Sequence, residues 1–513
     1  MASATADKWM VATSHPLAVE AALDVLEDGG NAVDAAVVAA AVLTVVDPRS
    51  TGIGGDAFAM YWGPRTQGPV GFAAAGPAPS GMSLETVRGA GFDAMPADGP
   101  WTVTVPGVVA GWERLLDRLG TIGLARAVEP AAAIAEAGFD VTRAIATDWI
   151  DSVDKLARYE YSASVYLSEG RAPALGERMQ NPDLAAALRA IGAEGSQVFY
   201  EGWIAERIDA AVREVGGPLR ASDLAGWRGP RWVTPISARF RDVDVYEMPP
   251  PNQGLLALQA LKIYEGLEPA SRVDEEHAAI ESLKLAFADA ERYIADPDVH
   301  PVPVEGLLSD DYIAERRRLV DPASAAAARA GSPSDTVYVA VMAEGEGCSF
   351  IQSIYSGFGS GVGVEGTGII LHNRGSGFVL ADGHPNRPEP GKRPYHTIIP
   401  AMLGREGALW GCLGVVGAFM QPQGHLQVLR ALLDRGADPQ AALDAPRFRF
   451  LGGRRVGFED SFDPAVATEL GGRGHTTTAI SSFEAGGGQL IVRSDGGLIG
   501  GSDPRKDGLA RGA

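Results

Sequence analysis

A threonine lies where the character of the sequence changes abruptly. The segment before it, AAAARAGSPSD, has the composition of an exposed connector and ends at Asp335, whereas the segment that it begins, TVYVAVMA, alternates as a strand does. A cut between Asp335 and Thr336 would give a threonine with a hydroxyl nucleophile and a free α-amine, whose pKa of about 7.7–8.0 suits a base near neutral pH. That pair of groups could attack an amide. An ordinary strand threonine fits the same residues, because threonine is common in strands.

The elements that would hold this threonine separate into a helix-rich and a strand-rich part. Helical spacing predicts two helices within residues 16–46, the first beginning at Pro16 and the second capped by Asn31, and residues 110–330 are largely helical in character. CSFIQSIY, after the turn EGEG, is the expected antiparallel partner of TVYVAVMA. The remaining C-terminal third is rich in Gly and in short strand-like runs. Helices first and strands second predict layered α and β structure rather than strict βαβ alternation.

Composition and charge exclude several classes of protein. With 513 residues, 46% of them hydrophobic, the chain can bury a large core, and 44 basic against 65 acidic residues give a net charge of −21 that repels nucleic acid and anionic membranes. The two cysteines, Cys348 and Cys412, provide neither a disulfide framework nor a CxxC pair. The N-terminus lacks the pattern of a signal peptide, and the longest apolar run, 33–46, is too short to cross a membrane. We therefore expect a soluble, cytoplasmic protein.

Three weaker patterns suggest other chemistry without completing it. STGIGGD at 50–56 is rich in Gly but lacks the Lys-Ser/Thr end of a phosphate-binding loop. Cys348 follows Gly347 and would be a nucleophile after a cut at that bond, yet a buried strand cysteine fits the sequence better. Four histidines of the C-terminal third match no short metal motif: His372, His384, His396 and His425. We expect no metal and no organic cofactor.

Longer blocks of sequence occur in an order that is typical of one family. In chain order they are HPLAVEAALDVLEDGGNAVDAAVVAA, VDPRSTGIGGDAF, VPGVVAGWERLLDRLG, EPAAAIAEAGFDV, MPPPNQGLLALQAL, FGSGV, GTGIILHNRGSGF, PGKRPYHTIIP and GGSDPRKDG. Together they resemble the gamma-glutamyltransferase family of N-terminal-nucleophile (Ntn) hydrolases. The resemblance implies an α+β fold, the αββα four-layer sandwich, formed by two chains cleaved from one precursor. The large subunit, 1–335, and the small subunit, 336–513, would stay paired, as one heterodimer or as a dimer of heterodimers.

The resemblance also assigns the catalytic groups. Thr336 falls at the family's nucleophile, and Ser353 falls at a threonine whose hydroxyl lies near that nucleophile. Gly417 and Ala418 fall at a Gly-Gly pair whose backbone N–H groups form the oxyanion hole. An alanine in the second place keeps its N–H, so the donor survives if the local backbone suits a non-Gly residue. For Ser353, a hydroxyl that is satisfied within its own strand is an equal alternative.

Substrate recognition departs from the pattern of the family's transferases. Ala73 stands where they bind the α-carboxylate of the γ-glutamyl group with an arginine, and Gly377 stands where an aspartate binds the α-amine. His396 and Thr397 replace a pair of serines that also bind the carboxylate. Loss of a bidentate arginine and of a counter-charge removes the strongest contacts to a zwitterionic head group. Gamma-glutamyl transfer is therefore not the leading prediction.

Another set of motifs resembles a divergent subgroup that includes oxamate amidohydrolase-like proteins. These motifs are NRGSGF, HPN, PGKRPYHT and MQPQGH. In this interpretation the candidates for substrate binding are Asn373, Arg374, His396, Thr397 and Gln423. Arg374 or Arg393 would bind a substrate carboxylate. Loop hydrogen bonds and ion pairs are an alternative role for each of these side chains.

The leading hypothesis is a self-processing N-terminal-threonine amidohydrolase or acyltransferase. Its substrate would be a small amide or acyl compound, such as an oxamate-like or gamma-glutamyl-like one, and water or an amine would resolve the acyl-enzyme. Two alternatives stay open. One is a true gamma-glutamyltransferase or glutathione hydrolase, and the other is a non-catalytic, uncleaved binding homologue, which the lost substrate contacts favour.

Overall fold

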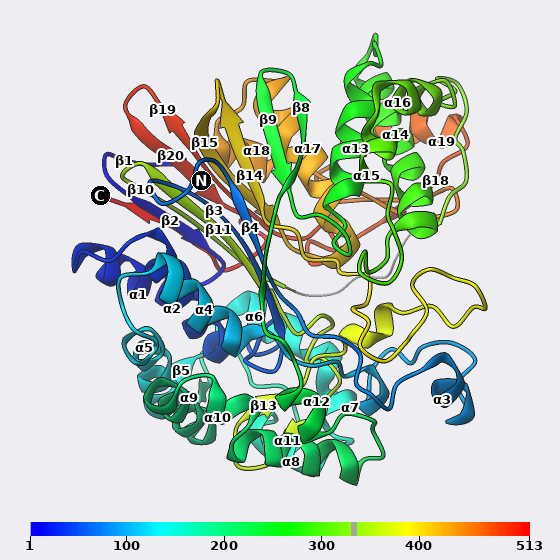
Figure 1. Cartoon of the computed structure of the whole chain (residues 1–513). Helices are drawn as coiled ribbons and strands as arrows, with labels where there is room; N and C mark the ends of the chain where they lie inside the picture. Colours follow the sequence, from blue (N-terminus) through cyan, green and yellow to red (C-terminus); the bar gives the residue numbers. More distant parts are fainter. Residues whose placement is uncertain (1, 330–335) are drawn as a thin grey trace.

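Two seven-stranded antiparallel sheets are stacked face to face in the computed structural model, which describes residues 2–329 and 336–513 (Figure 1). The first sheet has the order β21 (Leu509–Gly512), β2 (Met10–Thr13), β10 (Val337–Ala343), β11 (Glu346–Ser353), β3 (Asp56–Trp62), β4 (Val70–Ala74) and β7 (Arg231–Val233). The second has the order β1 (Ala4–Ala6), β20 (Gly497–Ser502), β19 (Gly488–Ser494), β15 (Ala408–Val415), β14 (Ala401–Arg405), β9 (Val243–Glu247) and β8 (Ile236–Phe240). Both sheets therefore combine strands from the two sides of the proposed cut.

Strand β10 is buried on both faces, which explains its nearly continuous apolar sequence. Its valines face one way, into the core beneath the first helical layer: Val337, Val339 and Val341. The alternate side chains face the other way, into the core between the two sheets: Tyr338, Ala340 and Met342. Alternate side chains of a strand point to opposite faces, so the central strands of a four-layer sandwich need apolar residues at every position. The predicted strand and its antiparallel partner β11 are confirmed.

Helices α1 (Pro16–Glu27) and α2 (Ala32–Val46) cover the outer face of the first sheet (Figure 1). All 15 residues of α2 are buried, and most of them are Ala or Val, whose small side chains let the helix lie close to β10 and β11. Asn31 caps α2 by accepting hydrogen bonds from the backbone N–H groups of Val33 and Asp34. Such a cap stabilises a helix by about 1 kcal/mol. Both predicted helices, with Pro16 at the start of the first, are confirmed.

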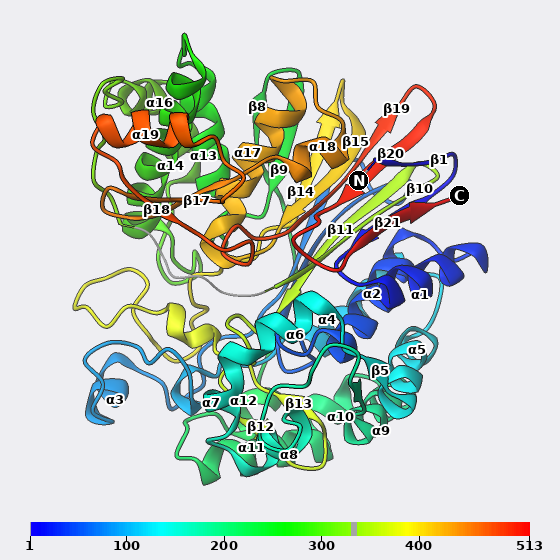
Figure 2. The same cartoon turned by 180° about the vertical axis from the view of Figure 1, so that it is seen from behind.

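The outer face of the second sheet is covered by α13 (Gly254–Glu265), α14 (Arg272–Tyr293) and α17 (Gln421–Leu433) (Figure 2). Around them lie α15 (Val304–Leu308), α16 (Asp310–Arg317), α18 (Pro439–Asp444), α19 (Pro464–Gly472) and a small sheet of β16 (Phe448–Gly452), β17 (Arg455–Phe458) and β18 (Thr476–Ala479). Helices on both outer faces complete the αββα sandwich that the resemblance implied.

The remaining elements lie mostly beneath the first sheet. The helices are α3 (Leu84–Gly89), α4 (Val108–Leu119), α5 (Leu124–Ala137), α6 (Arg143–Trp149), α7 (Val153–Leu156), α8 (Glu160–Tyr166), α9 (Pro182–Glu194), α10 (Gln197–Tyr200), α11 (Trp203–Glu214) and α12 (Ala221–Ala225). Short pairs are formed by β5 (Phe139–Asp140) with β6 (Arg178–Met179) and by β12 (Gly363–Val364) with β13 (Ile369–Ile370). Within residues 2–329 and 336–513, none of the helices has the length and hydropathy of a membrane-spanning segment.

Candidate active site

Three polar residues lie side by side across the middle of the first sheet. The register of β10 and β11 places Thr336, the residue before β10, opposite Ser353. The register of β11 and β3 pairs Ser353 with Asp56, the first residue of β3. Neighbours in such a row are roughly 4.5–5.5 Å apart and their side chains share one face of the sheet. The side chains two places along the same strands lie in the core between the sheets: Tyr338, Ile351 and Phe58. The row therefore faces the second sheet.

The hydroxyl of Thr336 is held by its neighbour in this row. Thr336 is buried, with 2% of its surface exposed, and its Oγ1 donates a hydrogen bond to Ser353 Oγ at 3.4 Å. Ser353 Oγ also accepts a hydrogen bond of 2.7 Å from the backbone N–H of Tyr355. The serine is thus fixed by the chain reversal that follows β11, and it can orient the threonine hydroxyl. Asp335, the other residue of the predicted cleavage site, lies outside the described residues.

A turn of the second sheet approaches the same place. β10 and β15 run in opposite directions on the two sides of the core between the sheets. The turn Gly417–Ala418, just beyond β15, therefore lies toward Thr336, just before β10. Two contacts fix this direction: the ring of Tyr338 packs on Gly414, and Cys412 Sγ lies 3.9 Å from the carbonyl oxygen of Val341.

The turn has the backbone geometry of an anion-binding site. Gly417 has φ 114° and Ala418 has φ 54°, so both residues lie in the left-handed region, which costs an alanine about 1–2 kcal/mol. Gln253 Nε2 holds the turn by donating to the carbonyl oxygen of Ala418 at 2.8 Å. Successive N–H groups in such a turn form a concavity that binds anions, and the N-terminus of α17, which follows directly, adds positive potential. Alanine at the second position therefore keeps a usable donor.

A buried cluster of charge and imidazole surrounds the carboxylate of Asp56. His396 Nε2 donates to Asp56 Oδ2 at 3.1 Å, His372 Nδ1 lies 3.2 Å from the same oxygen, and Arg374 Nε lies 3.9 Å from it. Burial by itself raises the pKa of Asp56, but the charge and hydrogen bonds of His372 and His396 outweigh it and hold this pKa well below its ordinary value. Burial and the nearby Arg374 charge lower the pKa of His396 to about 3. Asp56 is therefore ionised and His396 neutral at neutral pH.

Arg374 joins this cluster to Thr397, another candidate residue, and to Tyr355, which the sequence did not indicate. Its Nη1 donates to Thr397 Oγ1 at 2.9 Å, and its guanidinium lies 4.2 Å from the ring centre of Tyr355. Burial lowers the pKa of Arg374 to about 10, which still leaves the side chain charged at neutral pH. A fixed cation therefore lies beside the chain reversal that positions Ser353.

Two further candidates for substrate binding hold loops together. Asn373 Nδ2 donates to the carbonyl oxygen of Ala97 at 2.6 Å, and its Oδ1 accepts from the N–H of Ser356 at 3.0 Å. Gln423 Nε2 donates to the carbonyl oxygen of Phe419 at 2.9 Å, and its Oε1 accepts from the N–H of Phe450 at 2.7 Å. Both side chains use their amide groups on backbone and shape the site from outside. The remaining cation of the sequence-based set, Arg393, pairs with Asp296 at 2.5 Å and with Asp298 at 3.1 Å.

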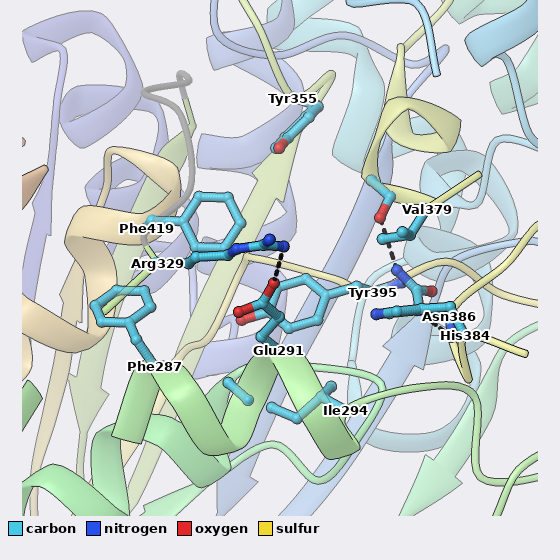
Figure 3. Close-up of a pocket in the computed structure, with 12 residues that line it drawn as sticks. Phe287, Glu291, Ile294, Arg329, Tyr355, Val379, His384, Asn386, Tyr395 and Phe419 are labelled. Atoms are coloured by element: carbon cyan, nitrogen blue, oxygen red, sulfur yellow. Dashed lines mark hydrogen bonds and ion pairs between the residues drawn. The ribbon is translucent and has the colours of Figure 1, made fainter. Parts of the chain in front are cut away.

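A cavity of about 200 Å³ opens next to these groups (Figure 3). One wall contains Tyr355, two residues after Ser353, and another contains Phe419, the residue after Ala418. Helix α14 with the residue after it, Arg329 and the segment 377–395 supply the rest of the lining. The cavity therefore lies beside the chain segments that follow Ser353 and Ala418.

Sequence reasoning missed Asp56, Tyr355 and Gln253. Asp56 did carry a signal, because it is a lone carboxylate at the start of the apolar run DAFAMYW, and a carboxylate at the head of a buried strand needs a partner. Tyr355 and Gln253 carried none, since their importance depends on which loops meet in space. Cys348 is the buried strand cysteine that the sequence favoured. Burial raises the pKa of its thiol well above the ordinary value, which suits a core residue and not a nucleophile.

Among the described residues, one group has the composition of a metal site, away from Thr336. His277, Glu281 and His475 are buried and bring their donor atoms together. However, Lys284 Nζ donates to Glu281 Oε1 at 2.7 Å and lies 3.4 Å from His475 Nδ1. The lysine ammonium thus takes the place that a cation would need.

The fold and the site geometry agree with one family. Residues 18–513 match the family model described as Gamma-glutamyltranspeptidase, and the chain belongs to this family. It is an Ntn hydrolase, so the family, the αββα fold of two antiparallel sheets flanked by helices, and the enzyme class expected from the sequence are confirmed.

Relatives within the family are named for different activities. The chain is 34% identical to the Glutathione hydrolase-like YwrD proenzyme of Bacillus subtilis (strain 168), over 98% of each chain. It is also 34% identical to the Oxamate amidohydrolase proenzyme of Klebsiella pneumoniae subsp. pneumoniae, again over 98% of each. Among solved structures, cephalosporin acylase from Bacillus halodurans matches with a TM-score of 0.95 and 41% identity, covering 100% of this chain and 97% of that one. Family membership therefore defines the class of enzyme and leaves the acyl group to be argued from the site.

Proposed function

We propose that the chain is cut between Asp335 and Thr336, and that Thr336, as the N-terminus of the small subunit 336–513, is the nucleophile of an amidohydrolase. The observation that carries the proposal is the place of Thr336 at the head of a central strand, with its Oγ1 3.4 Å from Ser353 Oγ, on the face toward the Gly417–Ala418 turn. The proenzyme names of both sequence relatives support such a cut. The large subunit, 1–335, would remain bound, because its strands share both sheets with the small subunit.

Self-cleavage uses the same hydroxyl as catalysis. Thr336 Oγ1 attacks the carbonyl carbon of residue 335, the peptide C–N bond breaks, and the hydroxyl proton ends on the released amine. The resulting ester between residue 335 and Thr336 Oγ1 is then hydrolysed by water. The products are a carboxylate on residue 335 and a threonine with a free hydroxyl and a free α-amine.

Substrate turnover repeats this chemistry on an external amide. The α-amine of Thr336 takes the hydroxyl proton while Oγ1 attacks the substrate carbonyl carbon, and the N–H groups of Gly417 and Ala418 stabilise the oxyanion. The C–N bond breaks, the leaving amine takes the proton from the α-ammonium, and the acyl group remains on Oγ1 as an ester. Water resolves the ester, with the α-amine again acting as base. Ser353 is a positioning residue for Oγ1.

The substrate in this proposal is a small amide or acyl compound. Oxamate-like and gamma-glutamyl-like amides are the first to test, because relatives of this chain are named Oxamate amidohydrolase and Glutathione hydrolase-like. Arg374 is the side chain best suited to bind a polar substrate group, since it is charged and buried beside Tyr355. Thr397 would hold that guanidinium in place, while His396, Asn373 and Gln423 would shape the surrounding loops.

Intact mass under denaturing conditions, with N-terminal sequencing, tests the proposal. Wild-type protein should give two chains, the smaller beginning Thr-Val-Tyr-Val, and Thr336→Ala should stay whole and inactive. Thr476→Ala, at the first residue of strand β18 and away from the site, is the matched control and should be cut normally. A Thr336→Ala protein that is cut at this bond and active would refute the nucleophile. A wild-type chain that stays whole on long incubation would favour the uncleaved binding homologue.

A further inference from the structure

Resting on the function proposed above, we propose that the acyl group transferred to Thr336 is uncharged and apolar, about the size of one aromatic ring with a short linker. It would occupy the cavity between α14 and the turn that carries Phe419. Within the small amide or acyl compounds proposed above, this class is the apolar one, and the charged oxamate-like and gamma-glutamyl-like groups are the alternatives that the test below would favour if the inference is wrong.

The cavity has an aromatic wall built from three separate elements (Figure 3). Tyr395 stacks on Phe419 with ring centres 5.7 Å apart and an angle of 23° between the rings. Phe287, from α14, packs against Phe419 at 6.2 Å. Ile294 and Val379 extend the apolar surface on either side. Such a surface favours a flat apolar group, because ring faces bury large areas and aromatic pairs prefer offset-stacked or edge-to-face geometry.

Several polar groups of the cavity are already paired with one another. Arg329 and Glu291 form an ion pair of 2.7 Å at the exposed rim, where each charge has the other as its partner. His384 Nδ1 accepts from the N–H of Asn386 at 3.0 Å, and Asn386 Nδ2 donates to the carbonyl oxygen of Gly377 at 2.7 Å. A charged acyl group would have to break these contacts or lose its own hydration without replacement. An apolar acyl group leaves all of them intact.

The size of the cavity sets the size of the group. An engineered apolar cavity of about 150 Å³ in another protein binds benzene. The cavity here, about 200 Å³, has room for a six-membered ring and one or two further carbon atoms. A phenylacetyl group has these dimensions, whereas an acetyl group would leave most of the apolar wall without contact.

Two residues that line this cavity adjoin the reacting groups in the chain. Tyr355 lines it and donates its N–H to Ser353 Oγ, which lies 3.4 Å from Thr336 Oγ1. Phe419 lines it from the other side and directly follows Ala418. A carbonyl placed between Thr336 Oγ1 and the N–H of Ala418 therefore directs its acyl chain past Tyr355 and Phe419 into the cavity.

A series of p-nitroanilides tests the inference on the mature enzyme. We expect kcat/KM to rise from acetyl through hexanoyl to phenylacetyl, by about 10–100-fold over the series, since each well-packed apolar group adds a factor of this order. Glutaryl and γ-glutamyl anilides should fall at least about tenfold below hexanoyl, because their charges find no free partner in the cavity. If either charged substrate outranks hexanoyl, Arg329 or Arg374 selects a carboxylate and the inference is wrong.

Two variants locate the selectivity in this cavity. Ala290→Leu, on the α14 wall, should reduce phenylacetyl turnover about tenfold and leave acetyl turnover within about threefold, because it fills the cavity without touching Thr336. Val379→Asp, at the rim, should lower hexanoyl and phenylacetyl turnover selectively. Val299→Asp is the matched control, since Val299 is also an exposed valine but does not line the cavity. A general loss on all substrates would instead indicate a structural defect and contradict the assignment.

Direct binding separates this inference from the proposed function. Thr336→Ala cannot form an ester, so calorimetry on it should show phenylacetamide binding at least about tenfold more tightly than acetamide, with the difference lost on adding Ala290→Leu. If phenylacetamide binds but no ester forms on Thr336 of the wild type, the proposed function fails and the cavity assignment stands. If esters form on Thr336 without apolar preference in turnover or binding, the cavity assignment fails and the proposed function stands.

Discussion

Two buried clusters in this molecule contain histidines and opposite charges. They differ in whether all of their polar atoms have hydrogen-bond partners. The first, which we name the Asp56 cluster, consists of Asp56, His372, Arg374 and His396. Within the part of the chain that the structure describes, Asp56 Oδ1, His396 Nδ1 and two nitrogens of Arg374 have no hydrogen-bond partner. These atoms belong to residues that adjoin Ser353 and Tyr355.

The second cluster, named here the anchoring cluster, consists of His277, Glu281, Lys284 and His475. Its two histidines are linked, since His475 Nε2 donates to His277 Nδ1 and His277 Nε2 donates to the carbonyl oxygen of Asp321. Lys284 Nζ donates to Glu281 and to the carbonyl oxygen of Ala326. Each of these side chains has a partner. Because the cluster binds the backbone of residues 321–326, it fixes the chain just upstream of the proposed cut.

The difference indicates which cluster serves stability and which serves chemistry. A buried polar network that is fully satisfied rigidifies its surroundings, whereas each unsatisfied polar atom costs about 1–3 kcal/mol. A folded chain keeps such atoms where they have a use, and active sites are the usual place. We therefore expect the Asp56 cluster to govern activity and the anchoring cluster to govern stability.

The largest effect is expected for Asp56→Asn. Removing this carboxylate leaves Arg374 buried without its nearest counter-charge, which should lower the free energy of unfolding by about 3–5 kcal/mol. It should also slow cleavage before Thr336 and lower kcat/KM at least about 100-fold, because Asp56 is the cross-strand neighbour of Ser353 and small misplacements are costly in catalysis. Chemical denaturation, intact mass and initial rates measure the three effects. Asp382→Asn, at an exposed ion pair with Arg88, is the control and should change none of them measurably.

Glu281→Gln should reduce stability and spare activity. The change leaves Lys284 without its carboxylate and weakens the hold on Ala326, and we expect a loss of about 2–3 kcal/mol in the free energy of unfolding. Burial already lowers the pKa of Lys284, so this lysine can lose its proton and limit the cost. Cleavage and kcat/KM per folded molecule should stay within about twofold. A tenfold fall in kcat/KM at full folding would show that the two clusters are not functionally separate.

Acid should lower the free energy of unfolding through the anchoring cluster within a defined pH range. Burial, with the charge of Lys284 adding to it, lowers the pKa of His475 to about 3, whereas a histidine in an unfolded chain has a pKa of about 6.5. As the pH falls from 6.5 toward 3, the unfolded chain takes up this proton before the folded chain does. The contribution of His475 to the free energy of unfolding therefore decreases through that window and is constant above it. Each such histidine contributes about 1.4 kcal/mol per pH unit at most. Denaturation of His475→Gln at several pH values should show a shallower slope, by about one proton. An unchanged slope would mean that His475 is protonated in the fold.

The sequence allowed much of the framework and part of the site to be predicted. Helices α1 and α2 and strands β10 and β11 follow from local spacing, caps and turns, which act over a few residues. Thr336 and Ser353 came from a resemblance over most of the chain, and their closeness is consistent with it. Arg374 and His396 were candidates from the resemblance, but their meeting with Asp56 could not be predicted, because it joins the head of β3 to loops more than 300 residues away in the chain. The anchoring cluster joins His277 to His475, 198 residues away, and no local pattern marks either.

The smallest effect is expected at the Gly417–Ala418 turn, the proposed oxyanion site, where a substitution separates backbone strain from function. Ala418 adopts φ 54°, a conformation that glycine accepts freely, so Ala418→Gly should relieve strain while keeping the N–H donor. Glycine also makes the unfolded chain more flexible, which offsets part of the gain, so we expect at most about 1 kcal/mol of added stability and a change in kcat/KM below about threefold. Ala485→Gly, at another fully buried alanine without a positive φ, should instead destabilise the protein by about 1 kcal/mol. If Ala418→Gly lowers kcat/KM tenfold with cleavage intact, the methyl group itself shapes the oxyanion site, and the backbone alone does not account for it.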